Sequence, residues 1–205
     1  MKINQPLGLI ILSGGKSSRM GKDKAFLRLG ENALIEWVIK KGQERGLEEI
    51  IVVANEVEKY EKLKVKVVKD FYPGMGPLAG IHSGLIHSRY FNNFVVPCDM
   101  PFVSLNLINK LLSAQKNCQV VVPTMGGKCQ PLTAIYTQNC IPFIEELLKN
   151  NICKVTELYK LVETCYIEIQ EDMSFFNVNT PGDFLQAEDF FKRCIEEENN
   201  HISRD

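Results

Sequence analysis

The sequence has no hydrophobic run long enough to cross a membrane and no excess of charge of either sign. Its longest apolar stretch near the N-terminus, residues 7–12, is far shorter than the roughly 20 residues of a membrane-spanning helix, and it lacks the basic flank and cleavage site of a secretory signal. Lys and Arg number 24 and Asp and Glu number 25, giving a formal net charge of −1. This balance argues against a protein that coats nucleic acid or an anionic membrane. We expect a cytoplasmic protein in which any basic site is local.

Metal-binding and disulfide patterns are also missing. The seven cysteines are an odd number, are widely scattered and form no CxxC or CxC pair, which speaks against both a disulfide framework and a zinc site. Among the three histidines, His82 and His87 are five residues apart and His201 lies in the polar tail, a poor spacing for metal ligands. We expect reduced, mostly packed thiols, including a buried structural Cys98.

Repeats, low-complexity segments and linkers are absent, so we expect a single domain spanning residues 1–205. A content of 45% hydrophobic and 24% charged residues is that of an ordinary globular protein. A chain of this length buries roughly 70% of the surface that it exposes when unfolded, which is enough for a core without disulfides or structural metal. Only the polar tail from about Glu196 resembles a disordered segment.

Short apolar runs rich in β-branched residues alternate with segments of helical period, which predicts an α/β fold with a largely parallel sheet. The predicted strands span residues 9–12, 50–54, 65–68, 93–97, 120–123, 133–137 and 165–169. The predicted helices span residues 33–45, 56–62, 81–89, 105–115, 140–149, 155–159 and 181–191. Pro181 is expected in the first turn of the last helix, with Thr180 as its N-cap. Ligands of open α/β sheets bind beyond the carboxyl ends of strands, so residues that directly follow strands are the candidates for a site.

A glycine-punctuated loop, residues 13–24, follows the first predicted strand and reads SGGKSSRMGKDK. Glycines let backbone N–H groups approach phosphate oxygens closely, and cations attract a polyphosphate. The loop matches neither the Walker A pattern nor G-x-G-x-x-G. It predicts an anion cradle, with a solvated basic loop as the alternative. The loop contains only one carboxylate and four cationic side chains, which are Lys16, Arg19, Lys22 and Lys24.

A lone aspartate, Asp99, follows the predicted strand 93–97 and stands within the sequence PCDMPF of residues 97–102. A carboxylate fixed at a strand end is a natural ligand for Mg²⁺, which prefers oxygen and usually shares one or two carboxylates with substrate phosphates. The alternative is structural, because the same side chain could cap a helix that starts near Ser104.

Two turn-rich segments complete the set of candidates. Residues 70–80 read DFYPGMGPLAG, and their glycines and prolines fix a backbone that could line a planar base or serve only as a rigid loop. Residues 176–181 read FNVNTP. In extended backbone Asn177 and Asn179 point to the same side, so they could reach one ligand or act as turn and cap residues.

Together these motifs resemble the molybdenum cofactor guanylyltransferase family, and the match runs almost end to end. Residues 12–24 resemble the family's L-A-G-G-x-S-x-R-M-G-x-D-K, with Ser13 where alanine is usual. Residues 76–80 resemble its G-P-L-x-G, and residues 98–101 its C-D-M-P. Residues 130–132 and 177–181 follow its Q-P-L and N-x-N-T-P.

The resemblance implies a Rossmann-like nucleotidyltransferase fold with a mostly parallel central sheet and helices on both faces. It implies transfer of GMP from GTP to the terminal phosphate of molybdenum-molybdopterin, with Mg²⁺ as cofactor. The implied catalytic residues are Arg19, Lys24 and Asp99, of which Asp99 holds the metal, and Asn177 and Asn179 bind the acceptor. The residues expected to bind GTP are Leu12, Ser13, Gly14, Gly15, Lys24, Asn55, Asp70, Gly76, Pro77, Leu78, Gly80 and Asp99.

Two other functions compete with this one. A related nucleotidyltransferase would use CTP or a different acceptor, and a nucleotide-sensing module would keep the cradle without turnover. The presence of both Lys24 and Asp99 favours an enzyme, because sensing alone has no evident need for a metal carboxylate. Besides the two substrates, molybdoenzymes or their chaperones are possible transient partners of a protein with this function.

Overall fold

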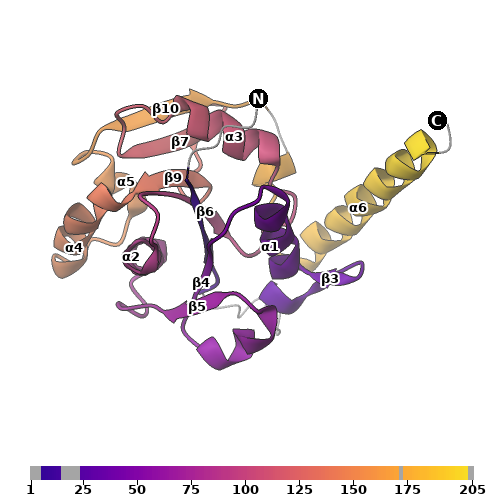
Figure 1. The fold of residues 1–205 in the computed structure, drawn as a ribbon, viewed down its shortest axis with the longest axis horizontal. Coiled ribbons are helices and arrows are strands. Elements are labelled where there is room, and N and C mark those ends of the chain that lie inside the picture. Colours follow the sequence, from indigo (N-terminus) through magenta and orange to yellow (C-terminus); the bar gives the residue numbers. More distant parts are fainter. Residues whose placement is uncertain (1–5, 15–23, 171–172, 203–205) are drawn as a thin grey trace.

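A largely parallel sheet lies at the centre of the fold, with helices on both of its faces (Figure 1). The structure is a computed structural model that describes residues 6–14, 24–170 and 173–202, with side chains described to residue 196. Across these residues the main sheet has eight strands. This confirms the predicted α/β fold class.

The strand order places β1 in the interior of the sheet. The strands, in spatial order, are β10 (Thr164–Glu168), β7 (Val120–Met125), β9 (Ala134–Thr137), β6 (Asn92–Pro97), β1 (Gly8–Leu12), β4 (Ile50–Ala54) and β5 (Lys66–Lys69), with β8 (Lys128–Cys129) paired to β7. Strands β6, β1, β4 and β5 are parallel, as are β7 and β10. Strand β9 runs antiparallel to both of its neighbours, and β8 runs antiparallel to β7.

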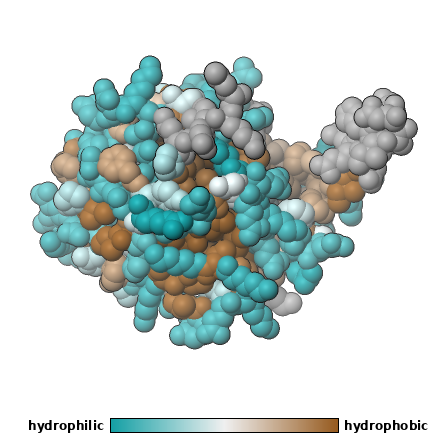
Figure 2. Space-filling view, viewed as in Figure 1, coloured by the Kyte–Doolittle hydropathy of each residue, from teal (hydrophilic) through white to brown (hydrophobic). Residues whose placement is uncertain are grey.

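The interior strands are continuous apolar runs because helices cover both faces of the sheet. Side chains alternate between faces along a strand, so Leu9 and Ile11 join one core layer and Ile10 joins the other. The first layer lies under α1 (Leu34–Glu44) and α3 (Leu105–Ala114). The second lies under α2 (Pro77–His87), α4 (Ile141–Lys149) and α5 (Val155–Leu158). Figure 2 shows one face of the molecule, with a hydrophobic centre and a hydrophilic rim.

The last helix, α6 (Pro181–Ile202), packs beside a small hairpin of β2 (Arg28–Leu29) and β3 (Asn32–Ala33). Thr180 Oγ1 accepts a hydrogen bond from Asp183 N at 3.1 Å, which confirms the predicted N-cap. From there α6 leads away from the sheet (Figure 1). The helix continues to Ile202, so the polar residues from about Glu196, which look disordered by composition, form the end of a helix up to that residue.

Helix α2 begins at Pro77, four residues before the predicted start. Every residue from Leu78 to Leu85 is buried, so this helix has no polar face to reveal its period. Gly76, the N-cap, has a φ of 75°, a conformation that suits glycine. The predicted helix 56–62 is a 3-10 helix, η2 (Val57–Leu63).

The cysteines depart from the expectation of thiols that are all reduced. Cys118 and Cys165 form a disulfide, with their Cα atoms 5.8 Å apart, which is an ordinary separation for such a pair. Scattered positions in the sequence conceal the pair because its partners come from β10 and from the residues that precede β7. In the described part of the chain, no helix combines the length and apolar character that a membrane span requires.

Candidate active site

The carboxyl ends of β1 and β6 meet where the strand order of the sheet reverses. From β1 the chain moves outward to β4 and β5, and β6 then returns to the opposite side of β1. Cys98 N donates to Leu12 O at 3.0 Å, which joins the two strand ends, and Ser13 N donates to Val53 O at 2.9 Å. Ligands of open α/β sheets bind in the crevice at such a reversal.

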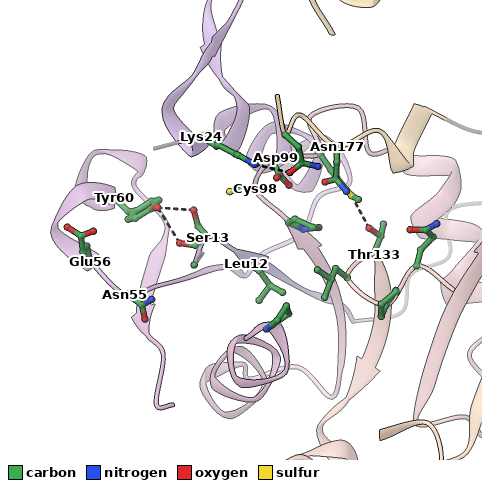
Figure 3. A pocket seen from close by; sticks show the side chains of 18 residues that line it. Leu12, Ser13, Lys24, Asn55, Glu56, Tyr60, Cys98, Asp99, Thr133 and Asn177 are labelled. Atoms are coloured by element: carbon green, nitrogen blue, oxygen red, sulfur yellow. Dashed lines mark hydrogen bonds between the residues drawn. The ribbon is translucent and has the colours of Figure 1, made fainter. Parts of the chain in front are cut away.

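A cavity of about 480 Å³ opens at this edge of the sheet (Figure 3). Its volume falls within the range of roughly 300–1,000 Å³ that is common for small-molecule sites. The predicted site residues that line it are Leu12, Ser13, Gly14, Lys24, Asn55, Pro77, Asp99, Asn177 and Asn179. Leu12 and Asn179, which are 167 positions apart in the chain, thus line the same cavity.

Asp99 follows β6 and lines the cavity between Lys24 and the asparagine segment (Figure 3). Burial raises the pKa of its carboxyl, and the nearby positive charge of Lys24 partly opposes that rise. Ser104, rather than Asp99, caps α3, because Ser104 Oγ accepts a hydrogen bond from Leu107 N at 3.1 Å. The structural alternative of a capping aspartate is therefore wrong, and the carboxylate faces a ligand-sized space.

Lys24 begins the 3-10 helix η1 (Lys24–Phe26) and is held toward the asparagine segment. Its Nζ donates to Asn179 Oδ1 at 2.8 Å. Asn179 N in turn donates to Asp183 Oδ2 at 2.9 Å, and this bond is the main reason that the pKa of Asp183 is lowered. The capping interactions of α6 therefore fix the residue that positions the lysine ammonium.

The donor atoms at this edge suit a hard divalent cation. Asp99 offers a carboxylate and Asn177 an amide group in the same cavity, while Asn179 Oδ1 already accepts a hydrogen bond from Lys24 Nζ. Among the described residues, no group of three or more His, Cys, Asp or Glu side chains is arranged so that it could hold a metal ion. One carboxylate with oxygen donors is the set that Mg²⁺ uses when substrate phosphates supply the remaining ligands.

Several residues predicted to bind GTP are not among those that line the cavity. Asp70 Oδ1 accepts hydrogen bonds from Tyr72 N at 2.9 Å and Ser83 Oγ at 3.1 Å, so its carboxylate ties the loop after β5 to α2. Gly76 caps α2, and Leu78 is fully buried in the core. A Cβ at Gly80 would lie 3.1 Å from Leu12 Cδ2.

Two predicted residues, Gly15 and Arg19, fall in residues 15–23, outside the described part of the chain. Gly80 lets α2 approach the end of β1 closely, and Pro77 is the part of the predicted 76–80 segment that reaches the cavity. The segment thus supports the site mainly by placing the first turn of α2.

The cavity also contains residues that sequence reasoning did not assign to it. Cys98, expected to be buried, is half-buried and lines the cavity beside Asp99. The Q-P-L sequence at 130–132 was a visible signal, but nothing local to it indicates that it returns to the end of β6. The remaining unassigned lining residues are Glu56, Tyr60, Pro97, Met100 and Thr133.

The arrangement combines a backbone turn, a cation, a desolvated carboxylate and two amides around one space. A carboxyl group whose pKa is raised by burial and that faces a cavity is a candidate for a functional role. A lysine ammonium, together with a divalent cation where a carboxylate holds one, can neutralise phosphate charge in a transferring nucleotide. The geometry therefore suits chemistry on a polyphosphate ester.

Comparison with known proteins agrees with this geometry. Residues 9–164 match the family described as the MobA-like NTP transferase domain. The chain is 38% identical over 185 residues to a probable molybdenum cofactor guanylyltransferase of Pelotomaculum thermopropionicum, covering 87% of this chain and 90% of that one. It is 31% identical over 180 residues to the molybdenum cofactor guanylyltransferase of Vibrio parahaemolyticus, covering 86% and 92%.

Solved structures show the same fold. Molybdopterin-guanine dinucleotide biosynthesis protein A from Archaeoglobus fulgidus superimposes with a TM-score of 0.78 at 27% identity, covering 91% of this chain and 99% of that one. A nucleotidyl transferase from Methanothermobacter thermautotrophicus, at 20% identity, superimposes with a TM-score of 0.74 and covers 93% and 99%. The second likeness concerns the fold alone.

Proposed function

The chain belongs to the family of MobA-like NTP transferase domains, and on that premise we propose that it transfers GMP from GTP to the terminal phosphate of molybdenum-molybdopterin. The products are the guanine dinucleotide form of the cofactor and pyrophosphate. The observation that carries the proposal is the convergence of Lys24, Asp99 and Asn179 at the carboxyl ends of β1 and β6, next to the turn that follows β1. Relatives named for this activity at 31% to 38% identity support the choice of substrates.

GTP is proposed to lie across the turn formed by Leu12, Ser13 and Gly14, with Asn55 on the neighbouring strand end. Gly15 and Arg19 would extend this cradle. Backbone donors and acceptors of the turn can match the O6, N1–H and N2–H₂ edge of guanine, whereas adenine presents a donor where guanine presents O6. Asp70, Gly76, Leu78 and Gly80 would act on nucleotide binding by fixing the loop and the first turn of α2 around Pro77.

Catalysis is proposed to rest on positioning and charge rather than on a strong base. An oxygen of the acceptor phosphate is already anionic, and it attacks the α-phosphorus of GTP as the bond to pyrophosphate breaks in line. Lys24 would hold phosphoryl oxygens through its ammonium, together with Arg19. Asn177 and Asn179 would orient the acceptor phosphate through their amide groups.

Asp99 would hold Mg²⁺, with Asn177 or Asn179 completing the protein ligands. When bound, Mg²⁺ supplies charge neutralisation at the phosphoryl oxygens and the leaving pyrophosphate. The burial of Asp99 limits competition from water for its carboxylate, and Lys24 keeps the anionic form accessible. We place the reaction in the cytoplasm, with molybdoenzymes or their chaperones as the class of protein that receives the product.

A nucleotide panel with pyrophosphate detection tests this proposal against its two rivals. With molybdopterin as acceptor and Mg²⁺ present, kcat/KM for GTP is expected to exceed that for ATP and CTP by about 100-fold, because mispaired buried polar groups cost about 1–3 kcal/mol each. Preference for CTP would indicate a cytidylyltransferase instead. GTP binding without acceptor-dependent release of pyrophosphate would indicate a sensing module.

A further inference from the structure

Tyr60 contacts the turn of Leu12, Ser13 and Gly14, and it belongs to a segment that has no predicted role in the site. It lies in η2, five residues after Asn55, and only 2% of its surface is exposed. Its hydroxyl is 2.8 Å from Ser13 Oγ and donates a longer hydrogen bond to Ser13 O at 3.4 Å (Figure 3). One phenol therefore contacts both the side chain and the main chain of the residue at the centre of the turn.

The ring of Tyr60 makes a second contact, with the segment that carries the lysine. Its centroid is 5.0 Å from the centroid of Phe26, with the ring planes at 40°. Phe26 ends η1, the short helix that Lys24 begins. Because ring packing and hydroxyl bonding come from one buried side chain, a shift of Tyr60 would displace the turn and η1 together.

We propose that Tyr60 is a positioning residue that fixes the position of the turn at Ser13 relative to η1, the short helix that carries Lys24. This inference rests on the proposed function of the site. The hydroxyl acts on nucleotide binding through Ser13. The ring acts on the placement of Lys24 through Phe26. The two roles are separable because different atoms of one side chain carry them.

Hydrogen bonds to both the backbone and the side chain of Ser13 hold the turn. Ser13 N donates to Val53 O at 2.9 Å, and Ser13 Oγ pairs with the hydroxyl of Tyr60. The pair restrains the turn before the nucleotide arrives, which lowers the ordering cost of binding.

Tyr60→Phe removes the hydroxyl and keeps the ring. A neutral hydrogen bond of ordinary strength corresponds to a change of about 2- to 10-fold in an equilibrium constant. We therefore expect the Kd for GTP, measured by titration calorimetry, to rise about 3- to 10-fold, with kcat within about twofold of wild type. A merely structural role would lower the melting temperature and leave the Kd of the folded fraction unchanged.

Ser13→Ala removes the other hydroxyl and leaves the Tyr60 hydroxyl able to donate to Ser13 O. It should raise the Kd for GTP by no more than Tyr60→Phe does, and the double variant should bind no more weakly than Tyr60→Phe, because Tyr60→Phe already breaks the contact that Ser13→Ala removes. Tyr60→Leu also removes the ring, and we expect a further fall in kcat of at least about 5-fold. Tyr90→Phe, which deletes a surface hydroxyl bonded to Glu48 at 2.8 Å, serves as the control and should change neither quantity.

The readouts separate this inference from the proposed function. If wild type forms no guanine dinucleotide, the proposed function fails, whereas the calorimetric comparison still reports on Tyr60. If wild type is active but Tyr60→Phe and Ser13→Ala leave the Kd for GTP unchanged, or if their effects on it multiply, the pair does not position the turn. A kcat for Tyr60→Leu equal to that of Tyr60→Phe would remove the role assigned to the ring.

Discussion

At the scale of single residues, the position and the partial burial of Asp99 determine how its carboxyl group behaves. It is held at the end of β6, and its carboxyl is sufficiently desolvated that burial raises its pKa despite the charge of Lys24. Partial burial of a carboxylate costs free energy unless a cation or hydrogen-bond donors compensate, because the charged group loses hydration. The proposed cation is Mg²⁺, and this leads to predictions for both activity and stability.

Replacing Asp99 with asparagine should lower kcat at least about 100-fold, the scale of losing one well-placed electrostatic group. The change preserves size and removes the charge that would hold Mg²⁺, so folding should be little affected. Pyrophosphate release at limiting Mg²⁺ measures the effect, with Asp189→Asn on exposed α6 as a matched control. Turnover close to wild type would show that the carboxylate has no part in metal binding.

The raised pKa of Asp99 also predicts how stability changes with pH in the absence of ligands. The unfolded carboxyl has a pKa of about 3.9, so the stability linked to its protonation is complete below that value and is lost as pH rises through the folded-state pKa. Asp99→Asn cannot lose a proton. Its melting temperature should therefore gain on that of wild type as pH rises from below 4 toward neutrality. A constant difference across this range would contradict the raised pKa.

Lys24→Ala should weaken GTP binding and slow turnover, because the ammonium faces the cavity from η1. Loss of a charge-assisted hydrogen bond costs about 1.5–3 kcal/mol, which corresponds to roughly a 10- to 150-fold fall in kcat/KM. Steady-state kinetics with GTP measures this fall. The matched control is Lys149→Ala, because Lys149 lies on α4 and pairs with Glu145. Equal effects in the two variants would reduce the proposed cradle to a diffuse basic surface.

At the scale of elements, glycines in helix α2 allow it to pack closely against strand β1 of the sheet. A Cβ at Gly84 would lie 2.4 Å from Ile10 Cγ2, and Ile10 is fully buried in β1. Gly84→Ala should therefore lower the free energy of unfolding by about 1–3 kcal/mol, as overpacking of a rigid core does. Denaturant unfolding measures the loss. Gly182→Ala in the first turn of α6, where the nearest atom would be 3.6 Å away, should leave stability equal or slightly higher; an equal loss would contradict close packing at Gly84.

The elements that sequence patterns predict well are those in which local pattern and burial coincide. Strand β4 matches its predicted bounds of 50–54, because a strand buried on both faces is a continuous β-branched run. Helix α2 is the opposite case, since complete burial removes the periodicity that would mark its start at Pro77. Local patterns also cannot reveal that Cys118 and Cys165 lie together, because that pairing depends on the order of strands.

At the scale of the whole molecule, the cavity is a product of topology. Residues that follow strands, such as Ser13 and Asp99, could be predicted as site residues because parallel strands place their carboxyl ends at one edge. Gln130 and Thr133 could not, because they reach the cavity only through β9, which runs antiparallel between β6 and β7. Tyr60 was missed for a similar reason, since its contact with Ser13 spans 47 residues.

The most direct test of the account is to incubate the protein with GTP, Mg²⁺ and molybdenum-loaded molybdopterin and to identify the product by mass analysis. Asp99→Asn provides the matched reaction with the proposed metal ligand removed. We expect a guanine dinucleotide of molybdopterin together with pyrophosphate in equal amount, and strongly reduced formation of both by the variant. Consumption of GTP without this dinucleotide, or equal product formation by wild type and Asp99→Asn, would contradict it.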